Sequence, residues 1–232
     1  MIEIALFGAT GRMGRAIAAA AAEREDVGIV ESGADVFIDF SAPAALEANL
    51  DAARAAGRPI VIGTTGLGSD EHRLIDEAGR SLAVLYSANM SLGVNLLAHL
   101  VRATAKRLGD DWDIEIAEMH HRHKVDAPSG TALLLGQAAA EGRDVSLDEV
   151  SDRGRDGMTG ARHPGHIGFA ALRGGSVAGE HQVIFAGEGE RIELGHRAES
   201  RAIFARGAIE AALWLRGKPP GRYSMADLLG LE

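Results

Sequence analysis

The sequence contains no cysteine. Without thiols a chain can form neither a disulfide nor a thiolate metal site, and it has no thiolate nucleophile. No apolar run approaches the roughly 20 residues that a membrane-spanning helix needs, and no basic segment opens the chain. Lys and Arg number only 24 against 33 Asp and Glu, and the net charge of -9 argues against a nucleic-acid partner. We therefore expect a cytoplasmic protein that binds neither membrane nor nucleic acid.

The first ninety residues alternate short apolar runs with helix-like segments. Ile2 to Phe7 is followed by a glycine-rich turn, Gly8 to Gly14, and by an Ala-rich stretch. Further strand-like runs, separated by helix-like segments, end at Phe40, Ile62 and Tyr86. This spacing predicts a parallel, doubly wound sheet whose ligand lies at the carboxyl ends of the strands.

Three loops of small residues follow these strand-like runs, at Gly8 to Gly14, Gly63 to Gly66 and Ser87 to Met90. The first has the order of strand, glycine turn and helix that a dinucleotide-phosphate loop requires. Its G-x-x-G-x-x-G spacing differs from the usual G-x-G-x-x-G, so a glycine turn without a ligand is the competing interpretation. Three such loops at one edge of a sheet favour cofactor binding more strongly than any one of them.

The segment after the first helix is short for a dinucleotide-binding fold. That fold places an acidic residue about 20 residues beyond the glycine loop, where it binds the adenosine ribose. Val27 to Val30 could be the strand that carries it, but only Glu31 to Gly33 separates this run from the next one. Parallel crossovers take about a dozen residues, so we do not expect both runs in the parallel sheet. The ribose side is therefore predicted to be abbreviated, with Glu31 a solvated turn residue.

The pattern changes from Ser91 onward. Ser91 to Leu108 has apolar residues near helical spacing, and Trp112 to Ala117 alternates as a strand does. After a long Gly- and Arg-rich loop come three short strand-like runs, Ile167 to Leu172, His181 to Ala186 and Arg191 to His196. The chain is thus predicted to be α/β, an abbreviated Rossmann-type sheet plus a second α+β domain with a mainly antiparallel sheet. Residues 1–90 and 202–232 are expected to form the dinucleotide-binding domain, and residues 91–201 the substrate-binding and oligomerisation domain.

The most unusual stretch runs from Glu118 to Thr131, Glu-Met-His-His-Arg-His-Lys-Val-Asp-Ala-Pro-Ser-Gly-Thr. It places three histidines, an arginine and Lys124 beside a turn that opens onto an apolar, helix-like run. Ser129 is expected to be the N-cap, which leaves the backbone N–H groups of Gly130 and Thr131 free to donate. Because helix N-termini attract carboxylates and phosphates, this stretch is predicted to be the chemical centre of an enzyme.

The residues alone leave three interpretations of this stretch open. The histidines and Lys124 could form a solvated loop without a function. His121 and His123, with Asp126 or Glu118, could bind zinc, which needs three or four ligands of fixed geometry. In the third interpretation, a histidine and Lys124 supply protons, the turn at Ser129 holds a substrate carboxylate, and a nicotinamide supplies hydride. We favour the third interpretation and expect no bound metal.

The stretch closely resembles the signature of the 4-hydroxy-tetrahydrodipicolinate reductases, also called dihydrodipicolinate reductases. Other motifs resemble patterns of this family in the same order, namely Gly8 to Gly14, Ile38 to Pro43, Gly63 to Gly66, Ser87 to Asn95 and Gly179 to His181. The resemblance covers nearly the whole chain. It implies reduction of a cyclic imine dicarboxylate by NADH or NADPH, on the diaminopimelate route to lysine.

The resemblance also implies roles for individual residues. His120 matches the family's proton donor and acceptor, and Lys124 matches its proton donor. His121, Gly130 and Thr131 match substrate-binding positions, with Ser129 beside them. The cofactor loops correspond to Gly8, Ala9, Thr10, Gly11, Arg12, Met13, Gly63, Thr64, Thr65, Ser87, Ala88, Asn89 and Met90. Members of the family are homotetramers joined through the sheet of the second domain, so residues 167–196 would supply the interface.

The chain departs from the family pattern at Glu31 to Gly33, where family members carry a further strand, helix and strand. Their contacts to the ribose and to its 2′-phosphate have no clear counterpart here. We therefore predict weak discrimination between NADH and NADPH, with Arg12 the conspicuous basic group near the adenosine side. Alternative functions are a dinucleotide-binding regulator without catalysis, a metal-dependent hydrolase, and a reductase of a different imine.

Overall fold

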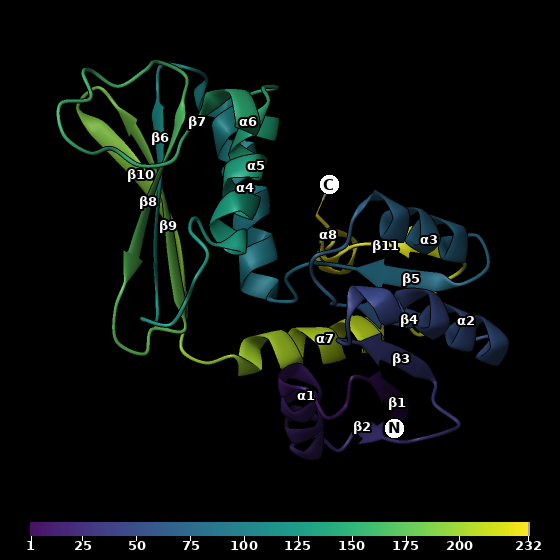
Figure 1. Cartoon of the computed structure of the whole chain (residues 1–232). Helices are drawn as coiled ribbons and strands as arrows, with labels where there is room; N and C mark the ends of the chain where they lie inside the picture. The colour runs from purple at the N-terminus through teal and green to yellow at the C-terminus, as the bar shows by residue number, and fades with distance from the viewer. Residues whose placement is uncertain (232) are drawn as a thin grey trace. The chain divides into compact units, whose positions relative to one another are not determined.

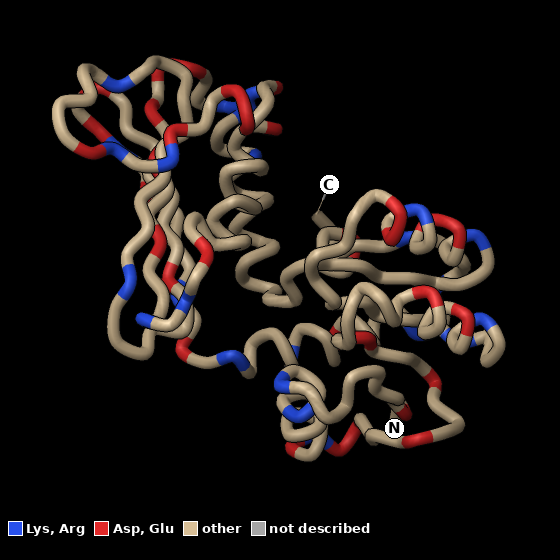
Figure 2. Tube along the Cα trace, viewed as in Figure 1, with Lys and Arg blue, Asp and Glu red and all other residues tan. Residues whose placement is uncertain are grey.

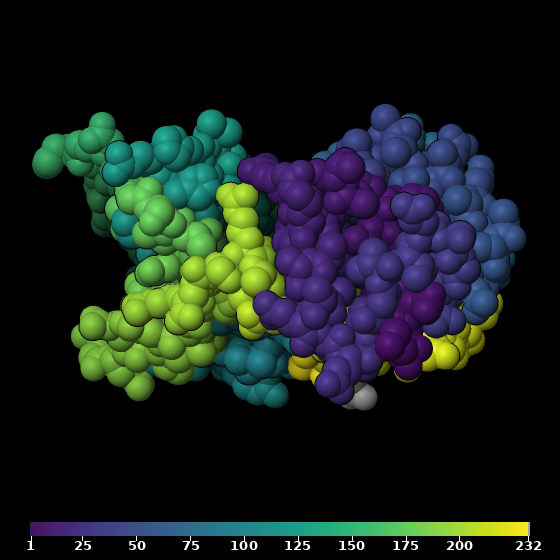
Figure 3. All heavy atoms as spheres, turned by 90° about the horizontal axis from the view of Figure 1, so that it is seen from below, coloured from purple at the N-terminus to yellow at the C-terminus, as the bar shows by residue number. Residues whose placement is uncertain are grey.

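The computed structural model describes residues 1–231, which divide into two compact units (Figure 1). The first unit comprises Met1–Leu92 together with the chain from Arg201 onward, and the second comprises Gly93–Ser200. N-terminal and C-terminal segments thus share the first unit, in which purple and yellow atoms both appear in Figure 3. Acidic and basic residues are interspersed over both units (Figure 2). No helix within the described chain is long and apolar enough to cross a membrane.

The first unit is built on a six-stranded parallel sheet, as the sequence predicts. Its strand order is β11-β5-β4-β3-β1-β2, and every pair of neighbours is parallel. The strands are β1 (Ile2–Phe7), β2 (Val27–Ile29), β3 (Val36–Asp39), β4 (Ile60–Ile62), β5 (Ala83–Tyr86) and β11 (Gly221–Tyr223). β11 was not predicted from the sequence, because its three residues are too few to show a period.

Helices cover both faces of this sheet and give it two hydrophobic cores. One core includes Ile17 of α1 (Arg12–Ala22) and Ile209 of α7 (Ala202–Leu215). The other includes Leu50 of α2 (Leu46–Ala56) and Ile75 of α3 (Ser69–Gly79), and the 3-10 turn η1 (Pro43–Ala45) precedes α2. The last helix, α8 (Met225–Leu229), is capped by the Ser224 hydroxyl, which accepts from the backbone N–H of Asp227.

The prediction that the runs at residues 27 and 34 could not both join the parallel sheet was wrong. β2 and β3 are both parallel to β1 but lie on opposite sides of it. β2 pairs with its first half, Ile2 to Ile4, and β3 with its second half, Ile4 to Phe7. Because β3 starts at the level where β2 ends, the chain need not travel back along the sheet. Residues 30–35 are therefore long enough to connect the two strands. Backbone N–H groups of Val30 and Asp35 hold this link in place by donating to the carbonyls of Ile4 and Glu3.

The second unit has a five-stranded sheet in the order β10-β9-β6-β8-β7. Its strands are β6 (Asp113–His120), β7 (Ser151–Asp152), β8 (Ile167–Arg173), β9 (Gly179–Gly187) and β10 (Glu190–Ala198). β9 is antiparallel to β10 and β6, in keeping with the predicted antiparallel pairing, whereas β8 is parallel to β6 and β7, so the sheet is mixed. The reason is the long connection from β6 to β8, which contains α5 (Gly130–Gly142) and α6 (Leu147–Val150) and is long enough for a parallel crossover.

Two helices, α4 (Leu92–Leu108) and α5, cover one face of this sheet, and the other face carries no helix (Figure 1). The core between them includes Val101, Ile116, Leu135 and Phe185. β6 alternates strictly between buried and half-buried residues, as the sequence predicts, but it continues three residues beyond Ala117. Glu118 and His120 therefore belong to the buried, helix-covered side of the strand, because side chains two positions apart share a face.

Candidate active site

His120 ends β6 and is held by a carboxylate of the same strand. Its Nδ1 atom lies 2.5 Å from Oε2 of Glu118, two residues earlier. Both residues are buried, with 8% of the surface of His120 and 2% of that of Glu118 exposed. The ring of His120 also meets the ring of His181 edge to face, with 5.0 Å between centroids. The imidazole is thus fixed on two sides within the second unit.

The Glu118 carboxylate is the centre of a buried polar network. Arg173 donates to both of its oxygens, at 2.8 and 2.9 Å, and the backbone N–H of Ser129 donates to Oε1 at 3.2 Å. Burial alone would raise the pKa of Glu118, but hydrogen bonds from Arg173 and His120 outweigh it and hold that pKa below its usual range. Glu118 is therefore ionised at neutral pH, and it joins the end of β6 to the start of α5.

Ser129 is the N-cap of α5, as predicted. Its hydroxyl accepts a hydrogen bond from the backbone N–H of Ala132 at 3.1 Å and lies 3.0 Å from Nε2 of His181. Burial, followed by the like charge of His120, lowers the pKa of His181 from 6.5 to about 4, so this second histidine is neutral at physiological pH. Ser129 is almost fully buried, with its hydroxyl and its N–H both engaged. Ser129 therefore stabilises the turn from the interior of the protein.

The remaining predicted residues of this stretch lie in the turn between β6 and α5. Lys124 pairs with Asp126, with Nζ 2.9 Å from Oδ1, and this hydrogen bond holds the pKa of Asp126 below its ordinary value. Gly130 is exposed as the first residue of α5, and Thr131 and His121 are partly exposed. The second unit thus brings a buried histidine, an ammonium group and a helix N-terminus into one segment.

The first unit contains the predicted phosphate loop, with close packing at its glycines. Gly8 has a φ of 82°, in the left-handed region that favours glycine. A Cβ at Gly14 would lie only 2.3 Å from the carbonyl oxygen of Gly8 and 2.5 Å from that of Ala9. α1 starts directly after Gly11, with no side-chain cap and no acidic residue in its first turn. Its first N–H groups are therefore available to an anion.

The other two predicted loops follow β4 and β5. A Cβ at Gly63 would lie 2.2 Å from the ring of Phe40, so only glycine fits under that ring. Thr64 is buried next to it. After β5, the Ser87 hydroxyl donates to the carbonyl of Asn89, whose own side chain accepts from the backbone N–H of Ser91. All three loops lie at carboxyl ends of strands of one parallel sheet, as the sequence predicts.

Two profiles of a single family match the chain. The profile described as "Dihydrodipicolinate reductase, C-terminus" matches residues 93–229, and the corresponding N-terminal profile matches residues 25–90. The chain belongs to the dihydrodipicolinate reductase family. This membership confirms the resemblance seen in the sequence.

Relatives and a solved structure agree with this family assignment. The chain is 56% identical to the 4-hydroxy-tetrahydrodipicolinate reductase of Zymomonas mobilis, over 99% of this chain and 98% of that one. It is 63% identical to the reductase of Parvibaculum lavamentivorans, over 86% of this chain and 73% of that one. The dipicolinate-bound dihydrodipicolinate reductase of Paenisporosarcina sp. TG-14 has the same fold, with a TM-score of 0.78, 22% identity and 98% of each chain covered. The α/β fold predicted from the sequence is confirmed.

The Zymomonas relative contains residues that this chain lacks. The alignment with the Zymomonas relative has 248 positions, 16 more than this chain has residues. That relative therefore carries at least 16 residues without a counterpart here. In this chain the link from β2 to β3, which contains the segment Glu31 to Gly33, is six residues long.

Two residues of this site were not predicted from the sequence in the roles that they have in the structure. Arg173 was not singled out, and Glu118 was considered only as a zinc ligand. The sequence did contain a signal for the role of Glu118, because Glu118 and His120 stand two residues apart at the end of an alternating strand and so share a face. Among the described residues, the possible zinc ligands His121 and His123, with Asp126 or Glu118, do not converge on one point. Among residues 1–231, the group whose ligand atoms do converge is Asp152, His163 and His166, in a different loop.

Proposed function

We propose that this protein is a 4-hydroxy-tetrahydrodipicolinate reductase, which uses NADH or NADPH to reduce a cyclic imine dicarboxylate to tetrahydrodipicolinate in lysine biosynthesis. The observation that carries the proposal is the arrangement of His120, Lys124 and the N-terminus of α5 in a chain 56% identical to such a reductase. As an enzyme of a biosynthetic pathway, it is proposed to act in the cytoplasm.

His120 and Lys124 are proposed to handle the protons of the reaction. The bound nicotinamide supplies a hydride, which leaves negative charge on the conjugated system of the substrate. A positioned imidazolium or ammonium group neutralises this charge as it develops. His120 is buried and oriented, which suits a proton donor and acceptor. Lys124 has about a fifth of its side chain exposed and is paired with Asp126, so it can exchange that carboxylate for one of the substrate.

The start of α5 is proposed to hold a substrate carboxylate. Gly130 and Thr131 are its first two residues, and the positive end of the helix dipole favours an anion there. His121 is proposed to bind the substrate from the preceding turn. Ser129 was predicted as a further binding residue. Since its hydroxyl and N–H are both engaged inside the protein, we propose that it shapes this cradle rather than donating to the substrate.

The three loops of the first unit are proposed to hold the cofactor. Gly8, Ala9, Thr10, Gly11, Arg12 and Met13 would surround the pyrophosphate at the uncapped start of α1. Gly63, Thr64 and Thr65, and likewise Ser87, Ala88, Asn89 and Met90, would line its other parts. The lack of space for a side chain at Gly14 and Gly63 supports this proposal, because such loops bring the backbone close to the ligand.

We further propose that the enzyme discriminates weakly between NADH and NADPH. β2 ends at Ile29, opposite Ile4, whereas β1 continues to Phe7 beside the glycine loop. The strand that should carry the ribose-binding acid thus stops three residues short of the end of β1. Glu31 is exposed in the link that follows. Among the described residues, we assign no acidic side chain at this edge to the ribose. Arg12 on α1 is the basic residue that we assign to the side of a 2′-phosphate.

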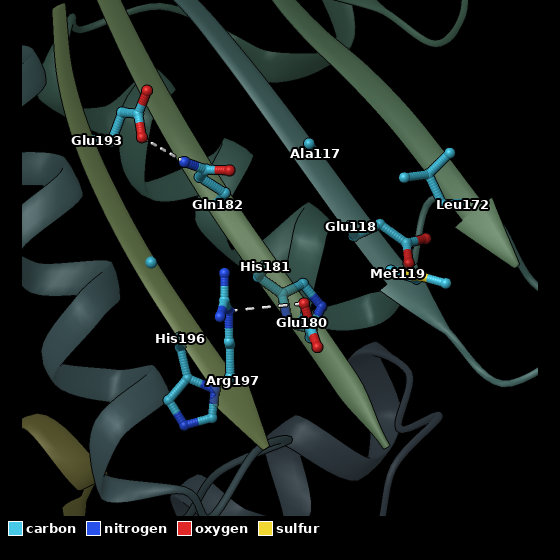
Figure 4. A pocket seen from close by; sticks show the side chains of 11 residues that line it. Ala117, Glu118, Met119, Leu172, Glu180, His181, Gln182, Glu193, His196 and Arg197 are labelled. Carbon is cyan, nitrogen blue, oxygen red and sulfur yellow. Dashed lines mark hydrogen bonds and ion pairs between the residues drawn. The ribbon is translucent and has the colours of Figure 1, made fainter. Parts of the chain in front are cut away.

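A homotetramer joined through the second sheet is also proposed. The face of this sheet that carries no helix exposes Leu172, and a hollow of about 420 Å³ lies on it (Figure 4). Gln182 bonds to Glu193, and Arg197 pairs with Glu180, across the two strands β9 and β10 at this hollow. A large sheet face left open suits an interface between copies. Light scattering would test this, and a single monomeric peak would contradict it.

The function is tested by the loss of absorbance of NADH, and separately of NADPH, with substrate made in place by the preceding synthase. Rapid oxidation of both cofactors, with Michaelis constants within a hundredfold of each other, is expected. Folded protein that binds a cofactor without oxidising it would instead support a non-catalytic dinucleotide-binding regulator. Activity lost on chelation would support the metal-dependent hydrolase.

A further inference from the structure

We propose that Glu118 is the positioning residue for His120. It fixes the ring hydrogen at Nδ1, so that Nε2 is the atom that exchanges a proton with the substrate. This inference rests on the proposed reductase function and assigns a role to a residue outside the predicted site. It follows from the donors around the carboxylate, from the open edge of the ring, and from the neutral histidine beside it.

The donors around Glu118 determine which atom of His120 carries hydrogen. The carboxylate receives both terminal nitrogens of Arg173, at 2.8 and 2.9 Å, and the backbone N–H of Ser129. Burial would raise the pKa of Glu118, but the hydrogen bonds from Arg173 and His120 keep it low, so the carboxylate is ionised. An ionised carboxylate can only accept hydrogen bonds. The 2.5 Å contact with Nδ1 of His120 therefore requires an N–H at Nδ1.

The opposite edge of the His120 ring is left open. Within the described chain, Nε2 makes no hydrogen bond, whereas Nδ1 is held by Glu118. A Cβ at Gly179 would lie 3.0 Å from this Nε2 and 3.3 Å from Cδ2, so the absence of a side chain there keeps the edge unobstructed. Nε2 of His120 therefore has open space beside it and can still form a hydrogen bond.

A neutral His181 adds no second positive charge beside a protonated, buried His120. Its ring packs against His120 at 5.0 Å, and its pKa of about 4 keeps it neutral when His120 is charged. The charges beside the His120 ring are the Glu118 carboxylate and the Arg173 guanidinium that pairs with it, while Lys124 in the following turn pairs with Asp126.

In the proposed step, His120 donates the proton on Nε2 to the substrate. In the imidazolium form His120 carries hydrogens on both nitrogens. The Nε2–H bond breaks, the proton joins the reduced substrate, and the electron pair remains on Nε2. The ring is left neutral with its hydrogen at Nδ1, still bonded to Glu118, and it regains a proton at Nε2 from solvent.

A kinetic cycle tests the proposal with Glu118→Gln, His120→Gln and the double variant. We expect Glu118→Gln to lower kcat by about 100-fold, the scale of general acid–base catalysis, with a smaller change in the Michaelis constant of the cofactor. The double variant should be no slower than His120→Gln alone, because Glu118 acts through His120. Multiplicative losses in the double variant would show a separate structural role and overturn the proposal.

Glu115→Gln is the matched control. Glu115 lies on the same strand three residues earlier, on the other side, and it is also paired with arginine, accepting hydrogen bonds from Arg155 and Arg162 where Glu118 accepts from Arg173 alone. The variant removes an arginine-paired carboxylate from β6 without touching His120. We expect kcat within about twofold of the wild type. A loss equal to that of Glu118→Gln would overturn the proposal.

A second measurement needs no variant that could fail to fold. Nitrogen-15 NMR of the imidazole of His120 in the wild-type protein distinguishes the two neutral tautomers. The Nδ1–H form is expected, and the Nε2–H form would overturn the proposal. This result is independent of turnover, so a wild-type protein that fails to oxidise NADH or NADPH would refute the reductase function and leave the positioning of His120 to be decided by the spectrum.

Discussion

The hydroxyl of Ser129, at the start of α5, lies 3.0 Å from Nε2 of His181 on β9. The same oxygen caps α5 by accepting from the backbone N–H of Ala132. One buried hydroxyl therefore joins the start of α5 to His181, which lies 52 residues further along the chain.

The first prediction follows from this double role. Ser129→Ala should lower the free energy of unfolding by about 2 to 4 kcal/mol, of which about 1 comes from the lost cap and the rest from the unpaired nitrogen of His181. Ser224→Ala is the control, because Ser224 caps α8 at an exposed position. It should cost only about 1 kcal/mol. Urea unfolding measures both, and equal losses would contradict the assignment.

The second prediction concerns stability in acid. The folded pKa of His181 is lowered from 6.5 to about 4, so between these values the unfolded chain binds a proton that the folded chain does not. Stability from this group is complete above pH 6.5 and is lost as the pH falls to about 4, by roughly 3 kcal/mol. His181→Gln should flatten this part of the curve of unfolding free energy against pH. An unchanged slope would contradict the burial of a neutral His181.

The third prediction concerns Lys124. Lys124→Ala should lower kcat by roughly 100-fold or more, because a proton donor and a positive charge are lost from the turn. Binding of NADH, measured by fluorescence, should be unchanged. Arg122→Ala removes a positive charge from the same turn at an exposed position and is the control. If both variants lose activity equally, the general charge of the turn matters rather than Lys124 itself.

The fourth prediction tests the phosphate loop. Gly14→Ala should abolish measurable NADH binding, because the new Cβ would lie 2.3 Å from the Gly8 carbonyl and displace the loop. Gly28→Ala is the control in β2, where the nearest atom to a new Cβ is the sulfur of Met1 at an ordinary 3.5 Å. It should bind NADH as the wild type does. Retained binding by Gly14→Ala would show that the cofactor is held elsewhere.

Local features of this protein were predictable from the sequence because they depend on neighbours along the chain. The alternation in β6, the left-handed Gly57 that ends α2 and the Ser129 cap each follow from a few consecutive residues. The strand-helix spacing predicted the parallel sheet for the same reason. The motif from Glu118 to Thr131 indicated the family, which the comparisons confirmed.

Other features depend on register between strands that are distant in sequence. The sequence could not show that β3 starts at the level where β2 ends, which is why both strands fit beside β1. Nor could it show that β8 is parallel to β6, which made the second sheet mixed. Pairing partners of this kind are chosen by the packing of whole units, and no short window of sequence contains that information.

The sequence by itself determined the chemical groups of the candidate site, since His120, Lys124 and the α5 cap lie within a dozen residues of one another. Only the tertiary structure decided how His120 is held. Arg173 stands opposite His120 on β8, and His181 stands opposite Glu118 on β9, because of the strand register. The physical reason is that a buried carboxylate needs several donors, and only a folded sheet can bring donors from three separate segments to one side chain.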